Sequence, residues 1–157
     1  MSSIRERIID AVHTALNTDR PEGIPETVRT RIVSPDADDL PAITLYQEGE
    51  GVTPKNEERE GMWGRDVIVN RAVTFNVEVL VKAGTGDPPA DQAADPYLVW
   101  ATQAIVGAGR FDNLSMFCAD EMGTKFSYEQ ENYAFCRATM TWKVKYKSRT
   151  DDPEHLS

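Results

Sequence analysis

The sequence lacks the residues and motifs on which most enzyme active sites are built. Only two histidines and two cysteines occur among its 157 residues. Neither His13 nor His155 has cysteine or carboxylate neighbours at the spacing of a metal site. No Gly-x-Ser-x-Gly stretch is present, and neither cysteine has an evident base beside it. We therefore expect a non-enzymatic protein that uses no metal and no cofactor.

Two groups of carboxylates are the remaining candidates for chemistry. Asp36, Asp38 and Asp39 together resemble the ligand set of a hard cation. Glu129 and Glu131 flank a turn, where they could act as a pair of carboxylates. Turns are commonly rich in aspartate, and turn carboxylates are commonly exposed, so we expect both groups to be ordinary turns.

Long apolar runs and runs of basic residues are also missing. No stretch of about 20 apolar residues occurs, so we expect no membrane span. The start of the chain is charged and lacks the apolar core of a signal peptide. The composition is acidic, with 26 Asp and Glu against 17 Lys and Arg, a formal charge of −9. Binding to duplex DNA needs clustered Lys and Arg, and the sequence has no such cluster.

The two cysteines, Cys118 and Cys136, lie in apolar, strand-like patterns. This placement indicates small core residues that stay reduced. Whether they lie near enough to pair depends on geometry that the sequence does not contain.

The strongest pattern in the chain is the alternation between Arg65 and Lys82. From Val67 onward its odd positions are apolar except for Arg71, and most of its even positions are polar. Because successive side chains on a strand point to opposite faces, this segment predicts a long strand with one buried face. At about 3.3 Å per residue the strand would run on the order of 50 Å. We expect its beginning, up to Arg71, to project from the body of the protein.

The same reasoning predicts the other elements. They are a helix from the Ser3/Glu6 capping box to Asn17, a hairpin of strands 27–34 and 42–47, a helix that opens at Asp95-Pro96 or near Asp91, a strand or strand entry at 114–118, and strands 125–130 and 133–147. The order α-β-β-β-α-β-β predicts one α+β domain over residues 1–147, a mainly antiparallel sheet with two helices on one face. Strand 133–147 is the expected antiparallel neighbour of the long strand. Residues 148–157 form a polar tail that we expect to be frayed.

Some apolar residues have no evident place in the core. Met62 and Trp63 lie in a long, polar, glycine-rich loop, 48–64, and either fold back on the core or contact another subunit. Tyr97, Val99 and Trp100 make the start of the second helix apolar nearly all round, so another element or a partner must cover it. The candidate interface residues are Met62, Trp63, Arg71, Tyr97 and Trp100.

Several segments, taken in order, carry a resemblance to a known family. They are 4–12, 40–46, the long strand led by Arg65, the second helix, and 138–146 followed by Asp152-Pro153. This arrangement resembles the bacteriophage tail terminator proteins, also called tail completion or minor tail proteins. Loop 48–64 matches no motif of that family.

The resemblance implies a structural role in the virion, in the neck of a phage tail. Members of the family are small α+β proteins that form a ring, commonly a hexamer, on the last ring of tail tube protein. The ring stops tube growth and offers a surface to head-completion proteins, beside the sheath where there is one, and DNA passes through its lumen without specific binding. The alternatives are a head–tail connector or tail tube protein of similar fold and, from another class, a small acidic cytosolic enzyme or ligand-binding domain.

Overall fold

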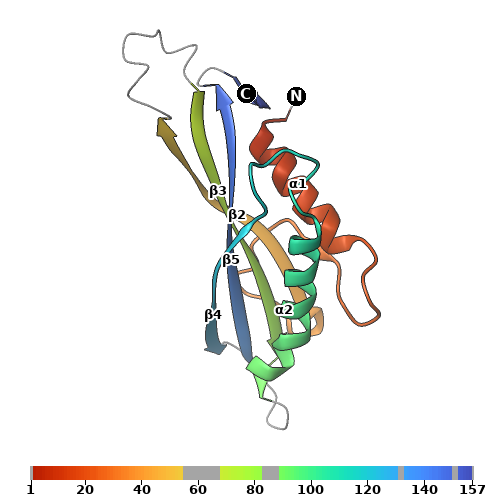
Figure 1. Cartoon of the computed structure of the whole chain (residues 1–157). Coiled ribbons are helices and arrows are strands. Elements are labelled where there is room, and N and C mark those ends of the chain that lie inside the picture. Colours follow the sequence, from red (N-terminus) through yellow and green to blue (C-terminus); the bar gives the residue numbers. More distant parts are fainter. Residues whose placement is uncertain (1, 55–67, 83–88, 131–132, 150–151, 157) are drawn as a thin grey trace.

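The elements form a six-stranded sheet with two helices on one of its faces (Figure 1). The computed structural model describes residues 2–54, 68–82, 89–130, 133–149 and 152–156. In chain order the elements are α1 (Ile4–Asn17), β1 (Thr27–Val28), the 3₁₀ turn η1 (Ala37–Asp39), β2 (Ala42–Pro54), β3 (Ile68–Lys82), α2 (Ala90–Gly107), β4 (Asp120–Gln130), β5 (Ala134–Arg149) and β6 (Asp152–Leu156). The α+β class and the two helices are confirmed.

The sheet is built around the β3–β5 pair. The strand order is β1-β2-β3-β5-β4, and β6 pairs with β5 beside this path. β3 and β5 run antiparallel in unbroken register from Ile68↔Arg149 to Lys82↔Phe135. The expected pairing of the two long alternating segments is therefore confirmed.

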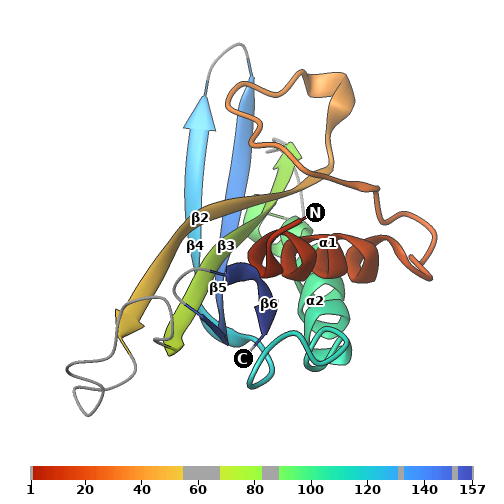
Figure 2. The ribbon, with the colours of Figure 1, turned by 90° about the horizontal axis from the view of Figure 1, so that it is seen from above.

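The helices cover the face that carries the apolar residues of β3 and β5, and this contact makes the core. Trp142, Phe75 and Tyr146 are its largest side chains and are almost fully buried. Ile4, Ile8, Val12 and Leu16 of α1 recur at helical spacing and are buried against this face. Each such side chain contributes about 1.5–3 kcal/mol when it is removed from water. The helices and the strands can be seen as two layers in Figure 2.

The first turn of α1 is held by the expected cap. The Ser3 hydroxyl accepts a hydrogen bond of 3.2 Å from the Glu6 backbone N–H. We expect Ser3→Ala to lower the free energy of unfolding by about 1 kcal/mol, because this amide then loses its partner. Urea unfolding measures the change. Ser2→Ala is the matched control, since Ser2 is exposed and precedes the cap. Equal unfolding midpoints for the two variants would show that the cap contributes nothing.

The predicted hairpin of 27–34 and 42–47 is wrong. Only Thr27 and Val28 form a strand, and they pair with β2 in parallel rather than antiparallel. The physical reason lies on β5, because the Arg137 guanidinium donates to the Ile32 and Val33 carbonyls at 2.6 and 2.9 Å. Carbonyls that a hairpin ladder would have used are thus bound by a side chain.

Other boundaries also differ from those expected. β2 continues to Pro54, well into the segment expected to be a loop, and pairs with β3 around a bulge near Gly49. Segment 114–118 consists of turns and bends. There the Ser115 hydroxyl donates to the Phe117 carbonyl at 2.6 Å and the Ser115 N–H donates to the Arg110 carbonyl at 3.2 Å, bonds that hold the segment in a turn. α2 starts at Ala90, the earlier of its two expected starts, and contains Pro96.

The tail expected to be frayed is ordered over most of its length. Ser148 and Arg149 complete β5, and β6 pairs with them. The Glu154 carbonyl also accepts a hydrogen bond from the Arg7 side chain of α1. The pairing with β5 and this contact with α1 order the tail, and its polar composition indicated neither of them.

Candidate functional site: an open face and two unpaired sheet edges

The helices leave one face of the sheet open. Side chains of Asn76 and Glu78 on β3, and of Thr139, Thr141 and Lys143 on β5, point to this face. A polar hollow of about 400 Å³ lies among these side chains except Lys143, with Tyr46, Lys125 and Glu129 in its walls. In Figure 2 both helices lie on the other side of these strands. Leu80 and Phe135 point to the same face and are buried at one end of it, while polar side chains line its middle.

One end of the open face is closed by a buried ion pair. Arg137 and Glu78 lie 2.6 Å apart, with 7 % and 2 % of their side chains exposed. Arg137 also donates to Glu129 at 2.7 Å and to the two carbonyls of the 32–33 segment. Its guanidinium thus fastens this segment across the sheet. We call Arg137, Glu78 and Glu129 the Arg137 cluster. Its role is structural, because the Arg137 guanidinium donates to groups of the same chain.

A second ionic group, the Glu50 cluster, lies on the helix side where β2 and β3 extend away from the core. The Glu50 carboxylate accepts from Arg5 at 3.3 Å, from Arg71 at 3.0 Å and from the Tyr146 hydroxyl at 3.0 Å. Arg71 also donates to the Ser148 hydroxyl at 2.6 Å. Burial, and secondly the nearby Glu50 charge, raise the pKa of Tyr146, so its phenol stays protonated and keeps donating.

The candidate interface residues fall into two groups. Met62 and Trp63 lie outside the described residues. Arg71 is 15 % exposed in its side chain and belongs to the Glu50 cluster. Tyr97 and Trp100 pack against the core, and the Trp100 indole donates to the Leu16 carbonyl at 3.2 Å. Contacts within the chain therefore cover these three positions in part, and their interface role stays a prediction.

An unpaired sheet edge with apolar side chains lies instead at β4. In the described part of the chain β5 is the partner of β4, and no strand pairs with its outer edge. Phe126 and Tyr128 of β4 point to the helix side, opposite the buried Ala138 and Cys136, yet they are 42 % and 64 % exposed.

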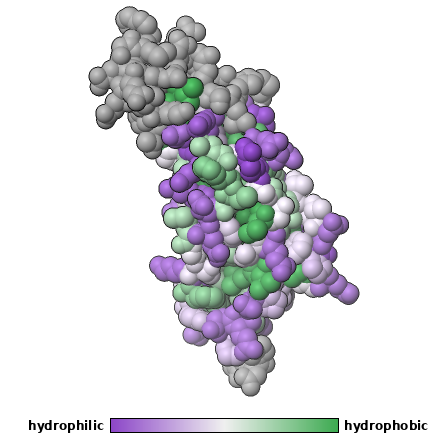
Figure 3. Space-filling view, viewed as in Figure 1, coloured by the Kyte–Doolittle hydropathy of each residue, from purple (hydrophilic) through white to green (hydrophobic). Residues whose placement is uncertain are grey.

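Next to this edge, between β4 and α2, runs a groove of about 500 Å³. Its floor contains Leu98 and Met140, and the exposed Val99 and Phe126 stand on its two sides. The hydrophobic surface in the lower half of Figure 3 lies over α2 and the neighbouring strands. We call this region the β4 groove.

The sheet has a second unpaired edge at β2. β1 covers only Ile43 and Thr44, so the outer edge from Leu45 to Pro54 has no strand beside it in the described chain. The two free edges lie on opposite sides of the sheet. Such edges offer rows of backbone donors and acceptors to another strand.

The residues considered for chemistry do not come together as a catalytic group where the structure describes them, and Glu131 lies outside the described residues. The expectation that both cysteines lie in the core is wrong for Cys118, which is exposed in the bends before β4, while Cys136 is buried. Burial raises the pKa of the Cys136 thiol and disfavours the reactive thiolate. His13 on α1 contacts the Thr27 carbonyl at 2.8 Å. Within the described residues, no three His, Cys, Asp or Glu side chains are grouped to hold a metal ion.

Comparisons with known proteins leave the assignment to physical reasoning. No protein-family model matches the chain, and no curated protein shows significant similarity to it. Among the described helices, none has both the length and the apolar character needed to cross a membrane.

The sequence interpretation missed both ionic clusters and the β4 groove. Glu50 lies in a stretch that was expected to be a loop, and Arg137 was one of several polar residues on an alternating strand. The one available signal for the groove was Phe126 and Tyr128, two aromatic residues at alternate positions of a strand whose neighbours are polar.

Proposed function

We propose that this protein is a non-enzymatic structural component of a bacteriophage tail. It forms a ring at the head-proximal end of the tail tube, stops tube polymerisation and provides the surface on which the head joins. Its partners are further copies of itself, the tail tube protein and head-completion proteins. DNA passes through the ring.

The observation that supports this proposal best is the pair of free edges on opposite sides of one sheet. Two different surfaces that pair with each other make a head-to-tail contact, and such contacts close into a ring when the rotation between copies allows it. The β4 edge of one copy would pair with the β2 edge of the next. The exposed apolar side chains of the β4 groove would be covered in the same step.

Assembly of the purified protein tests the proposal. Light scattering after size exclusion, and electron microscopy with and without tail tube protein, should show closed rings of one size. Phe126→Glu should weaken ring formation at least about tenfold, because it puts a charge into the centre of the contact. The matched control is Val33→Glu, since Val33 is 63 % exposed and lies outside the β4 groove.

The controls define what would contradict the proposal. Urea unfolding of the Phe126→Glu monomer should stay within about 1 kcal/mol of the wild type, because Phe126 is already exposed. A strict monomer at high concentration that also forms no ring on tail tube protein would refute a terminator. A tail tube protein, the nearest alternative, would grow into long tubes instead of stopping at one ring. A connector would bind head proteins but not the tube.

A further inference from the structure

The open face carries a row of lysines in an acidic chain. Lys143, Lys145 and Lys147 alternate along β5, so they share the face opposite the helices. Alternate residues of a strand lie about 6.7 Å apart, and the row therefore spans about 13 Å. Within the described residues, none of the three forms an ion pair. We call these residues the lysine row.

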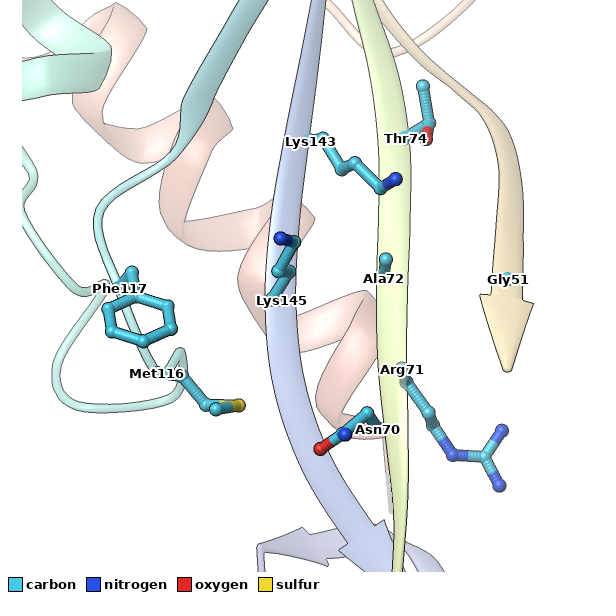
Figure 4. Close-up of a pocket in the computed structure, with 9 residues that line it drawn as sticks. All are labelled: Gly51, Asn70, Arg71, Ala72, Thr74, Met116, Phe117, Lys143 and Lys145. Carbon is cyan, nitrogen blue, oxygen red and sulfur yellow. The ribbon is translucent and has the colours of Figure 1, made fainter. Parts of the chain in front are cut away.

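The strands beside the lysine row carry small, uncharged side chains. Asn70, Ala72 and Thr74 of β3 lie opposite the three lysines. Beyond them, Gly51 and Gly49 of β2 pair with Ala72 and Thr74, and both glycines border open space. These small residues leave a hollow of about 590 Å³ along Lys143 and Lys145 (Figure 4). A bulky chain can therefore approach the sheet closely here.

An exposed aromatic ring borders the other side of the row. Met116 and Phe117 come from the segment before β4, and the Met116 N–H donates to the Lys145 carbonyl at 2.8 Å. This bond holds the segment beside β5 and places Phe117, 61 % exposed, at the hollow (Figure 4). The neighbouring acidic position is Asp120, opposite Lys143 on β4. It is exposed and makes no ion pair within the described chain.

We infer that the lysine row and Phe117 form a surface that binds the phosphate backbone of a nucleic acid without reading its sequence. Ammonium groups are compact charges suited to phosphate, and each contact releases a counterion from the nucleic acid. The aromatic ring decides between nucleic acid and an acidic peptide, because bases stack on such a ring and carboxylates do not. This inference goes beyond the proposed function and holds for a single copy of the chain.

The surface escapes a search for basic runs because its lysines alternate with apolar residues. The formal charge of −9 opposes binding over long distances. At about 0.1 M salt, however, the Debye length is about 10 Å. Acidic groups on the helix side are then screened from a strand held on the open face, so affinity is set by the groups on that face, the lysine row and the opposing charge of Asp120.

Fluorescence anisotropy with labelled single-stranded and duplex DNA of mixed sequence tests the inference, starting at about 0.1 M salt. Three phosphate contacts predict a slope of log K against log salt of about −2.7 for duplex and about −2.1 for single strands. Lys143→Gln, Lys145→Gln and Lys147→Gln should each reduce the size of the slope by about 0.7–0.9. Phe117→Ala should weaken the single-stranded complex about tenfold and leave the duplex complex nearly unchanged.

Lys82→Gln is the matched control, because Lys82 is exposed at the far end of β3 and carries the same charge. It should bind DNA like the wild type. The inference is overturned if the wild type binds neither DNA, if Lys82→Gln lowers the slope as much as the row variants do, or if poly-glutamate binds in place of DNA. Since the protein is tested as a monomer, failure here leaves ring formation unaffected, and failure to form rings leaves this result unaffected.

Discussion

Arg137→Met should lower the free energy of unfolding by about 3–5 kcal/mol. The substitution leaves Glu78 as a charge that is 2 % exposed and has lost its cation. It also frees the Ile32 and Val33 carbonyls, so the segment that crosses the open face loses its anchor. Urea unfolding followed by tryptophan fluorescence, to which the buried Trp142 contributes, would measure the effect.

Two further variants show whether the loss comes from the ion pair. Arg137→Met combined with Glu78→Leu should recover a large part of the stability, because an apolar pair leaves no charge unpaired. Arg31→Met is the control on the same face, since Arg31 is exposed and contacts the Tyr46 ring at 5.9 Å, and it should cost no more than about 1 kcal/mol. If Arg137→Met unfolds like Arg31→Met, Glu78 is not a buried charge that depends on Arg137.

Arg71→Met is expected to have the second largest effect, a loss of about 3 kcal/mol in the isolated monomer. The Glu50 carboxylate, 10 % exposed, would keep the Arg5 contact and the Tyr146 hydroxyl but lose its most buried cation. The Ser148 hydroxyl would lose its donor as well. Unfolding is measured at concentrations at which no oligomer forms.

This measurement separates two roles for Arg71. If Arg71 acts in subunit contact alone, the monomer keeps its stability and only ring formation weakens. Loss of monomer stability assigns the residue to the Glu50 cluster. Lys82→Met removes a charge from the exposed end of the same strand and should unfold at the wild-type urea concentration.

Local patterns predicted the elements whose cause is local. The Ser3/Glu6 pair marked the start of α1, and the alternation of β3 and β5 identified the buried face of each strand and their pairing. An alternating pattern does not by itself ensure that a segment joins the sheet, however. The segment after Val28 has a strand-like pattern, yet its carbonyls bind a guanidinium from β5, more than 100 residues away.

The candidate surfaces were harder to predict, because they depend on which edges remain free. Tyr97 and Trp100 were selected for their apolar character, and both pack, partly buried, against the core of the same chain. Phe126 is exposed because neither of the described α-helices extends over β4, a consequence of strand order that no single segment contains. The lysine row could not be predicted for the same reason, because the space for a ligand beside it depends on the small residues of β2 and β3.

The central position of β5 has a consequence for how the protein folds. β5 is the second-last strand in the sequence, yet it joins β3 to β4. Its pairs with β3 range from Lys82↔Phe135 to Ile68↔Arg149, so they join residues that are far apart in the sequence. A high share of such distant contacts slows folding. During synthesis the edge of β3 that pairs with β5 must wait until nearly the whole chain has been made. A newly made chain thus stays exposed to wrong strand pairing until its last strands arrive.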